Sequence, residues 1–396
     1  MATYAFETIT ADQAANITAA DTVTFAGAAN RVGLVYQSYD PAALSPEVPS
    51  ILVTLDGRTV KFGTNFTQVT KVGQAVFGDG SKLVVGDTSD DWIGGSAQDD
   101  GLYGGPGADT VHGGRGDDLV QGNGGDDLLN GDLGSNTLYG GQGNDTIYVS
   151  TDAEVRGGFA HGNVGNDEIY GGGGGDTLLG GKGDDLLAGL GGADYLSGDL
   201  GDDELHGGEG ADTLLGGDGN DIIQTGGGAD RVLAGAGDDR VAIFYGGGAV
   251  VDGEGGNDTI TSVSAGKDIL RGGAGRDVFE FVSHTDPAQG QDDTILDWSG
   301  ADDKLSFAQV SIYAGPGEAA SILPREYSEF VANSYAEALS IANEHISAAG
   351  ARYVAAQVGA DVVVFVDSNG DPSDGADASV VLVGRSLADI GLENFI

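Results

Sequence analysis

The sequence predicts an all-β protein whose central part is a parallel β-roll, a solenoid of nine-residue repeats between two small caps. Three observations lead to this prediction. A nine-residue period runs through residues 86–280, glycine makes up 73 of the 396 residues, and acidic residues outnumber basic residues by 62 to 17. Hydrophobic residues still account for 40% of the chain, so we expect an ordered core rather than a disordered chain.

Composition excludes several classes of protein. The formal charge of −45 argues against nucleic-acid binding, which needs a basic surface for phosphates, and against unaided binding to anionic membranes. No run of 18 apolar residues is present, so we expect no transmembrane segment. The absence of Cys excludes disulfides, Cys-ligated metals and thiol nucleophiles.

Residues 1–85 precede the repeat and are predicted to form a β-rich N-terminal cap. Strands are expected at residues 22–25, 33–36, 51–55, 59–62 and 82–85, with a tight turn at Asp56 and Gly57 and a loop at residues 41–49. The segment either only covers the open end of the solenoid or also offers a surface for self-association or docking. No Lys or Arg precedes Arg31, so we expect no N-terminal signal peptide.

The repeat follows the template Gly-Gly-x-Gly-x-Asp-x-U-x, in which U is a large apolar residue. Of its 19 units, 18 have Asp at the sixth position, with Asn136 as the exception, and all 19 have an apolar residue at the eighth. Two units should form one coil of strand, turn, strand and turn, with the eighth residues in a shared core and parallel strands about 4.8 Å apart. Glycine permits the unusual turn conformations.

This arrangement stacks the Asp side chains of alternate units in columns. Two bare carboxylates at that spacing repel by very roughly 3–4 kcal/mol at an effective dielectric constant near 20, so a column needs counter-charge. Calcium fits best, because it takes six to eight hard oxygen ligands. The alternative is that these Asp residues only favour turns, which does not explain their regular register.

The predicted metal ligands are the sixth residues of the units, together with fourth-position glycines that bind through their backbone carbonyls. The side-chain ligands are Asp100, Asp109, Asp118, Asp127, Asn136, Asp145, Asp167, Asp176, Asp185, Asp194, Asp203, Asp212, Asp221, Asp230, Asp239, Asp258 and Asp277. The carbonyl ligands are Gly107, Gly116, Gly125, Gly174, Gly183, Gly192, Gly201, Gly210 and Gly219.

Two interruptions divide the repeat, at residues 149–161 and 243–252. They are either seams at which the coil register resets or outward loops that contact a partner. If each uninterrupted run is counted separately, pairs of units one coil apart predict about 13 calcium ions.

Units such as GGPGADTVH, GGRGDDLVQ and GGQGNDTIY resemble the nonapeptide of the repeats-in-toxin (RTX), or hemolysin-type calcium-binding repeat, family. Downstream, GGAGRDVFEF, DDTILDWSGADDKLSF, VVVFVDSNGD and the terminal ENFI resemble the C-terminal block of serralysin-type proteases and other substrates of type I secretion. The resemblance implies an uncleaved C-terminal secretion signal, the type I secretion machinery as a partner, and an extracellular or cell-surface location. It also implies repeats that fold when they meet extracellular calcium.

Residues 281–396 are predicted to form a β-rich C-terminal cap that holds the secretion signal and one helix. The helix is expected over residues 324–350, followed by strands at residues 353–358, 362–366 and 379–383. Residues 367–371 resemble the start of an EF-hand loop, but an ordinary β-turn is the preferred interpretation. Asp292, Asp293, Asp302 and Asp303 form either a further calcium site or a solvated acidic surface.

No catalytic residue is predicted. The chain contains neither H-E-x-x-H nor G-x-S-x-G, which argues against a serralysin-like zinc site and a lipase nucleophile. We therefore expect a secreted calcium-binding protein with a structural or cell-surface role, which self-assembles as a homo-oligomer or sheet. A calcium-dependent adhesion or ligand-binding module is the alternative, followed by a secreted hydrolase.

Overall fold

The structure, a computed structural model, describes residues 2–18, 22–37, 50–55, 58–63, 75–151, 156–245, 247–263, 266–282, 293–308, 327–349, 351–367 and 376–396. The fold is mostly β and consists of a β-solenoid of about 13 turns with small caps and one long helix, as the sequence predicts. Contacts between residues group the chain into two compact units, Met1–Gly192 and Ala193–Ile396.

The N-terminal segment contributes two three-stranded sheets, β1-β2-β6 and β3-β4-β5. Its elements are β1 (Thr3–Ala5), α1 (Ala11–Ala15), β2 (Thr22–Phe25), η1 (Ala29–Arg31), β3 (Gly33–Gln37), β4 (Ser50–Leu55), β5 (Arg58–Gly63), β6 (Ala75–Phe77) and β7 (Leu83–Val85). All five predicted strands are present, whereas β1, β6 and α1 were not expected. The predicted turn at Asp56 and Gly57 and the loop at 41–49 lie outside the described residues.

This segment covers the first turn of the solenoid with an aromatic core. The ring of Phe25 stacks on Phe6 at 5.0 Å and on Phe77 at 4.6 Å. Tyr103, which belongs to the repeat, is fully buried in the same cluster, and its hydroxyl donates a hydrogen bond to the Val32 carbonyl. The predicted capping role of the N-terminal segment is thereby confirmed.

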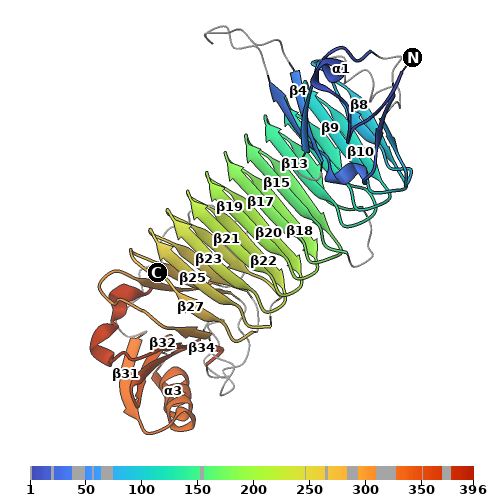
Figure 1. Ribbon diagram of the computed structural model, residues 1–396. Coiled ribbons are helices and arrows are strands. Elements are labelled where there is room, and N and C mark those ends of the chain that lie inside the picture. The colour runs from blue at the N-terminus through green and yellow to red at the C-terminus, as the bar shows by residue number, and fades with distance from the viewer. Residues whose placement is uncertain are drawn as a thin grey trace, which may run out of the picture. The chain divides into compact units, whose positions relative to one another are not determined.

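The repeat in the first unit forms two parallel sheets that alternate along the chain, β8-β10-β12-β14-β16-β18 and β7-β9-β11-β13-β15-β17. Figure 1 shows the odd-numbered strands of this unit side by side. The strands are β8 (Trp92–Ser96), β9 (Gly101–Pro106), β10 (Thr110–Gly114), β11 (Leu119–Gly124), β12 (Leu128–Asn130), β13 (Thr137–Gln142), β14 (Thr146–Tyr148), β15 (Phe159–Val164), β16 (Glu168–Gly172), β17 (Thr177–Lys182) and β18 (Leu186–Gly191).

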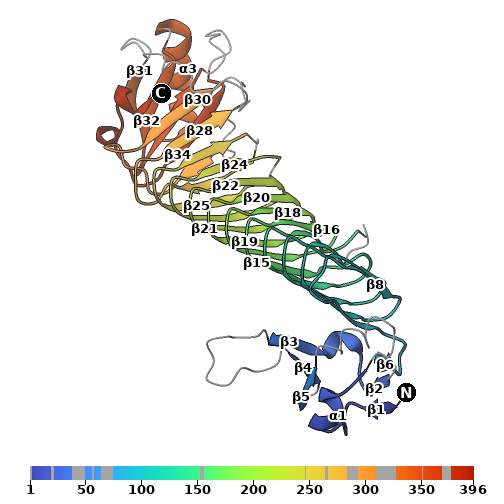
Figure 2. The same cartoon turned by 90° about the horizontal axis from the view of Figure 1, so that it is seen from above.

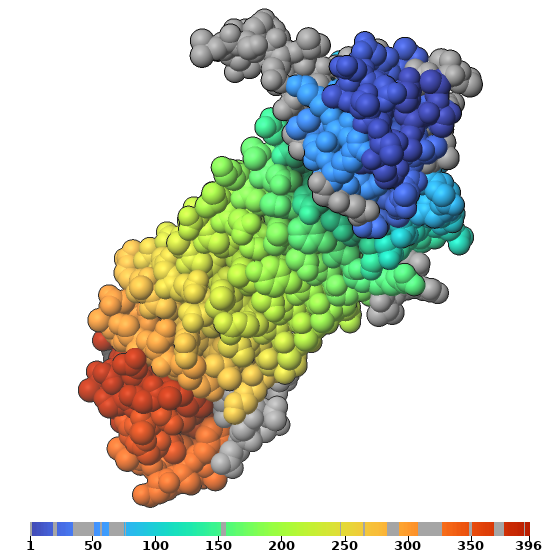
Figure 3. All heavy atoms as spheres, in the orientation of Figure 1, coloured from blue at the N-terminus to red at the C-terminus, as the bar shows by residue number. Residues whose placement is uncertain are grey.

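The second unit repeats this arrangement and ends in the C-terminal cap. Its solenoid strands are β19 (Tyr195–Leu200), β20 (Glu204–Glu209), β21 (Thr213–Asp218), β22 (Ile222–Gly227), β23 (Arg231–Ala236), β24 (Arg240–Ile243), β25 (Val250–Gly255), β26 (Thr259–Ser262), β27 (Ile269–Arg271) and β28 (Val278–Val282), followed by β29 (Asp293–Ile295) and β30 (Lys304–Ala308), which extend the same sheets beyond the last repeat unit. Within each unit the space-filling view shows successive turns packed against one another (Figure 3).

The cap of the second unit comprises β31 (Tyr327–Ala332), α3 (Tyr335–Ala349), β32 (Tyr353–Val358), β33 (Asp361–Val366), β34 (Ala378–Leu382), η3 (Leu387–Asp389) and η4 (Leu392–Asn394). Strand β34 pairs with β29, and α3 lies beside the cap strands (Figure 2). Ala342 and Ile346 of α3 are buried in one apolar cluster with Val354 and Phe365 of the sheet. No helix among the described residues is long and apolar enough to cross a membrane.

The predicted helix over residues 324–350 is wrong in its first part, because Tyr327–Ala332 is strand β31, parallel to β32. The helix begins later because Ser334 caps it, with its Oγ accepting a hydrogen bond from Glu337 N at 3.2 Å. Of the turn predicted at residues 367–371, only Asp367 lies among the described residues.

The eighth residue of each repeat unit forms the solenoid core. Leu138 is fully buried, whereas Leu128, a seventh-position residue, is 40% exposed. We expect Leu138→Ala to lower the free energy of unfolding by about 2–5 kcal/mol and Leu128→Ala to change it by less than about 1 kcal/mol. Denaturant unfolding at saturating calcium measures both, and equal losses would contradict this core.

Candidate metal centre

The sixth-position Asp side chains lie in two rows, one on each side of the solenoid, as the alternation of units predicts. Aspartate row 1 contains Asp91, Asp109, Asp127, Asp145, Asp167 and Asp185 in the first unit and Asp203, Asp221, Asp239, Asp258, Asp277 and Asp303 in the second. Aspartate row 2 contains Asp100, Asp118, Asn136 and Asp176 in the first unit and Asp194, Asp212, Asp230, Asp268 and Asp293 in the second.

One carboxylate oxygen of each Asp fixes the register between turns. Asp127 Oδ1 accepts a hydrogen bond from Asp109 N at 2.7 Å, and Asp145 Oδ1 accepts one from Asp127 N at 2.8 Å. The partners are 18 residues apart, which is one coil of two units. The side chain at this position therefore links each turn to the turn before it.

Row 1 continues through both interruptions of the repeat. Asp167 Oδ1 accepts from Asp145 N at 2.8 Å across 22 residues, and Asp258 Oδ1 accepts from Asp239 N at 2.9 Å across 19. The prediction that the register resets there is wrong for row 1. The reason is that the extra residues lie between strands, so that β16, which follows Asp167, pairs in register with β14, which follows Asp145.

The other carboxylate oxygen is buried without a hydrogen-bond partner in most turns. The Oδ2 atoms of Asp118, Asp127, Asp145, Asp167, Asp212, Asp221, Asp239 and Asp258 are in this state. A buried acceptor that lacks a donor costs free energy. Repetition of this cost in turn after turn indicates that a cation completes these sites.

In the units that begin with glycine, this oxygen faces a carbonyl oxygen from the next turn across a space that a side chain would fill. The units of Asp230 and Asp239 begin instead with Thr225 and Ala234. A Cβ atom on Gly113 would lie 2.5 Å from Asp118 Oδ2 and 2.6 Å from the Gly131 carbonyl oxygen. Gly122 has the same relation to Asp127 Oδ2 and the Gly140 carbonyl. Two acceptors thus converge where the first glycine of the unit has no side chain.

Burial and neighbouring charge make these carboxylates poor anions in the absence of metal. Burial, together with the nearby Asp167 and Asp127 carboxylates and against the hydrogen bond from Asp127 N, raises the pKa of Asp145 to about 8. Burial likewise raises the pKa of Asp118 and of Asp258 to about 7. A divalent cation would relieve both the desolvation and the repulsion.

The donor set fits calcium, since it consists of carboxylate and carbonyl oxygens. Among the residues that the structure describes, no group of three or more His, Asp or Glu side chains is arranged to hold a metal ion. These sites do not need such a group, because each combines one carboxylate with backbone carbonyls.

The fourth-position glycines that were predicted as carbonyl ligands lie at the turns, and all of them except Gly174 have left-handed backbone. Gly107 has φ 135° and Gly125 has φ 116°, and a Cβ on Gly125 would collide with the Gly107 carbonyl oxygen. Each such carbonyl therefore faces the next turn. Its binding to a metal stays a prediction.

Asp100, the first member of row 2, and Asp303, the last member of row 1, accept hydrogen bonds from protein donors on both sides of their carboxylates or on the second oxygen. Asp100 Oδ1 accepts from Ser96 Oγ at 2.9 Å and Asp100 Oδ2 from Ser96 N, while Lys82 Nζ donates to the carbonyls of Gly94 and Gly95 at 3.1 and 2.6 Å. At the C-terminal end of row 1, Asp303 Oδ2 accepts a hydrogen bond from Ser299 N at 2.7 Å. Protein donors for the second oxygen thus distinguish Asp100 and Asp303 from most interior members; among the interior members Asp268 shares this feature, because its Oδ2 accepts from Ser262 Oγ at 2.8 Å.

Four row members are absent from the predicted ligands. Asp91 and Asp268 belong to repeat units, and Asp293 and Asp303 follow the last unit; Asp268 N donates to Asp293 Oδ1 at 2.8 Å and Asp277 N to Asp303 Oδ1 at 3.1 Å. The sequence pattern that could have identified Asp293 and Asp303 as row members is an Asp two residues before an apolar residue, as in Asp293-Thr-Ile and Asp303-Lys-Leu. Asp292 lies outside the described residues.

A second ladder at the fifth position was not predicted. Asn144 N donates to Asp126 Oδ1 at 2.8 Å, Asn166 N to Asn144 Oδ1 at 2.9 Å, and Asp184 N to Asn166 Oδ1 at 3.0 Å. These side chains accept from the following turn, whereas the sixth-position side chains accept from the preceding one. Frequent Asp and Asn at the fifth position could have indicated it.

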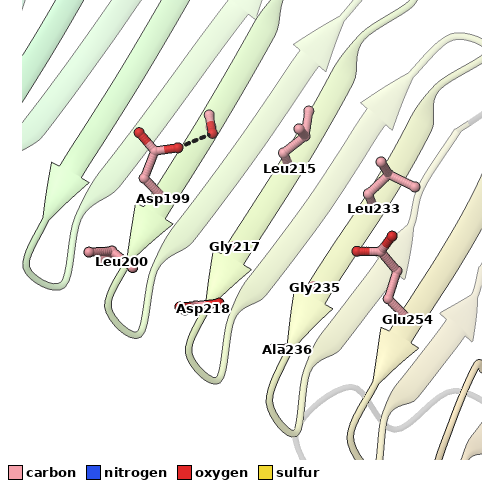
Figure 4. A pocket seen from close by; sticks show the side chains of 10 residues that line it. Asp199, Leu200, Leu215, Gly217, Asp218, Leu233, Gly235, Ala236 and Glu254 are labelled. Carbon is pink, nitrogen blue, oxygen red and sulfur yellow. Dashed lines mark hydrogen bonds between the residues drawn. The ribbon is translucent and has the colours of Figure 1, made fainter.

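An open hollow of about 490 Å³ lies across β19, β21, β23 and β25 in the second unit (Figure 4). Leu215 and Leu233 line it together with the acidic residues Asp199, Asp218 and Glu254. Ser197 Oγ donates a hydrogen bond to Asp199 Oδ1 at 2.7 Å. The hollow holds none of the predicted metal ligands.

Comparison with protein families finds a match to the RTX calcium-binding nonapeptide repeat (4 copies), at residues 85–120, 121–152, 159–187, 170–205, 179–214, 206–241 and 245–279. Among solved structures, the crystal structure of extracellular lipase LipA from Serratia marcescens matches with 17% sequence identity and a TM-score of 0.19. The match covers 64% of this chain and 44% of the lipase chain. A comparison with curated proteins gives no match.

Gly122 tests the space in which the two oxygens converge. We expect Gly122→Ala to reduce the number of bound calcium ions, because its Cβ would occupy the space between Asp127 Oδ2 and the Gly140 carbonyl. Gly124→Ala is the matched control on the same strand, since a Cβ there meets nothing within 4 Å. Native mass spectrometry at saturating calcium counts the ions; unequal counts support the site, and equal counts contradict it.

The raised pKa values predict a pH dependence of calcium binding. Asp in the unfolded chain titrates near pH 4, so at intermediate pH the metal-free solenoid holds protons that the unfolded chain has lost, and its stability falls as pH rises to about 8. Calcium displaces these protons, so apparent affinity should rise at least about tenfold from pH 5.5 to 8, with proton release. Calorimetry in two buffers measures both, and a pH-independent affinity would contradict the assignment.

Proposed function

Residues 85–279 are RTX, hemolysin-type calcium-binding nonapeptide repeats that form a β-solenoid, and we propose that the protein is secreted, folds on extracellular calcium and serves a structural or cell-surface role. The observation that carries this proposal is the series of buried Oδ2 atoms that have no hydrogen-bond partner. RTX repeats bind Ca²⁺, and each of these oxygens lacks only a cation.

The calcium ligands are the interior Asp side chains of the two rows whose Oδ2 has no protein donor, with Oδ2 directed to the metal and Oδ1 kept for the backbone of the preceding turn. Backbone carbonyls of the next turn, such as Gly140 opposite Asp127, add further oxygens. The bound ions supply positive charge between carboxylates, and this chain's residues position the oxygens and exclude side chains from the site.

Export and folding are coupled by the same sites. Proteins with RTX repeats are generally secreted by the type I pathway. At low calcium the rows of carboxylates disfavour the solenoid, so the chain stays unfolded and fit for export. Outside the cell, calcium binds only the folded solenoid, and its binding free energy becomes folding free energy.

A structural role by self-association is supported by β31, which lies at the edge of its sheet and leaves Val331 73% exposed. An open strand edge can pair with another chain. A non-catalytic role is supported by the sequence, which contains neither H-E-x-x-H nor G-x-S-x-G.

Calcium-dependent adhesion is the second candidate, favoured by aromatic side chains on the sheet of β8, β10, β14 and β16. Trp92 is 74% exposed beside His112, and the Tyr148 and Tyr170 rings stack at 5.0 Å. Exposed aromatic rings suit a ligand or a second surface. This candidate needs only one copy of the protein, which separates it from assembly.

Light scattering across a calcium titration tests the proposal on the full chain. From chelator to a few millimolar calcium, we expect the hydrodynamic radius to fall as the solenoid folds, with sheets or a fixed oligomer forming at saturation. A compact monomer at saturation would favour the adhesion module. No compaction at any calcium concentration would refute calcium-coupled folding.

A further inference from the structure

Asn136 occupies one of the sixth positions in row 2, and both of its polar side-chain atoms have partners inside the protein. The side chain is 1% exposed. Its Oδ1 accepts a hydrogen bond from Asp118 N at 3.0 Å, as an Asp does in the other turns. Its Nδ2, which stands where an Asp would have Oδ2, donates to the Val149 carbonyl oxygen at 3.1 Å.

The space beside Asn136 has the same shape as the neighbouring sites but a different chemistry. A Cβ on Gly113 would meet Asp118 Oδ2 and the Gly131 carbonyl, which are two acceptors. A Cβ on Gly131 would meet Asn136 Nδ2 at 2.5 Å and the Val149 carbonyl, which are a donor and an acceptor. Two acceptors need a cation between them. At Asn136, by contrast, the Nδ2 group donates a hydrogen bond directly to the facing carbonyl oxygen, and no cation is needed.

The orientation of the amide follows from its neighbours. Asp118 N is a donor and therefore faces Oδ1, and the Val149 carbonyl is an acceptor and therefore faces Nδ2. An NH₂ group carries partial positive charge and repels a cation from the space that it faces. Calcium at this point would also have to break the Asn136–Val149 hydrogen bond.

Resting on the calcium-binding function proposed above, we infer that Asn136 closes its turn with its own amide and binds no calcium, so that row 2 contains a built-in metal-free position. The neighbouring position of row 2 extends the gap, because it is occupied by Gly158, whose N donates to Asp176 Oδ1 at 2.6 Å. Row 1 keeps Asp145 and Asp167 across the same turns.

The two rows therefore have different roles beside the interruption at residues 149–161. Calcium joins these turns on the side of row 1 only, while row 2 is held by hydrogen bonds that do not depend on the metal. The sequence-based prediction made Asn136 a neutral calcium ligand. The two interpretations differ in what happens to the number of bound ions when the amide is removed.

Native mass spectrometry of the full chain at saturating calcium distinguishes them by counting ions. We expect Asn136→Ala to bind as many ions as the unaltered chain, because it removes a hydrogen bond and not a ligand. We expect Asn136→Asp to gain one ion, because it restores the pair of acceptors. Asp127→Asn is the reciprocal control in row 1 and should lose at least one ion.

A lost ion in Asn136→Ala would overturn the inference, as would an unchanged count in Asn136→Asp. Circular dichroism at saturating calcium shows which variants fold, and either Asn136 variant decides the question alone. Failure of the proposed function looks different: the unaltered chain would then bind no calcium, and Asp127→Asn would change nothing.

Discussion

The convergence of two buried oxygens in each turn is the constraint on which the solenoid depends. Asp127 Oδ2 and the Gly140 carbonyl approach the same space without a donor between them. Parallel pairing of β11 with β13 and of β12 with β14 repeats this arrangement at the spacing of the strands. The strand pairing that buries the apolar eighth residues is therefore the same event that brings the unpartnered oxygens together. Fold and metal affinity cannot be separated, because neither the core nor the row exists without the other.

The glycines and the Asp side chains of a unit act together in this constraint. Glycine at the first position leaves the space open, and glycine at the fourth position adopts left-handed backbone that turns its carbonyl toward the next coil. The Asp then uses its two oxygens differently: Oδ1 fixes the register to the preceding turn and Oδ2 is left for the cation. The exposed ladder at the fifth position, in which Asn144 N donates to Asp126 Oδ1, adds register in the opposite direction without adding buried charge.

The repeating parts of this fold can be predicted from the sequence, because the same residue types recur at the same positions in many units. The strand positions, the buried eighth residues and the stacking of Asp rows all followed from the period of nine. The predictions were wrong where the structure of a segment depends on one long-range pairing that occurs only once in the chain. Helical spacing over Tyr327–Ala332 suggested helix, yet pairing with β32 made it strand β31. The continuity of row 1 from Asp145 to Asp167 depends on long-range pairing, and no local pattern encodes it. The roles of Asp293 and Asp303 were obscured because the spacing, but not the Asp-x-apolar pattern, is lost after the last unit.

The ends of the rows show what the interior lacks. A turn at the end of a solenoid has no neighbour on one side, so it cannot share a cation between two turns. There, Ser96 and Ser299 supply donors to the second oxygens of Asp100 and Asp303, and the Lys82 ammonium lies on the carbonyls of Gly94 and Gly95. Protein donors at these positions thus have the same role as the metal in the interior turns: they satisfy carboxylate and carbonyl oxygens that lie close together. Interior turns made entirely with such donors would fold without calcium. Carboxylates without protein donors in the interior turns make the solenoid respond to calcium, whereas Asp100 and Asp303 need no calcium because serine donors satisfy their second oxygens.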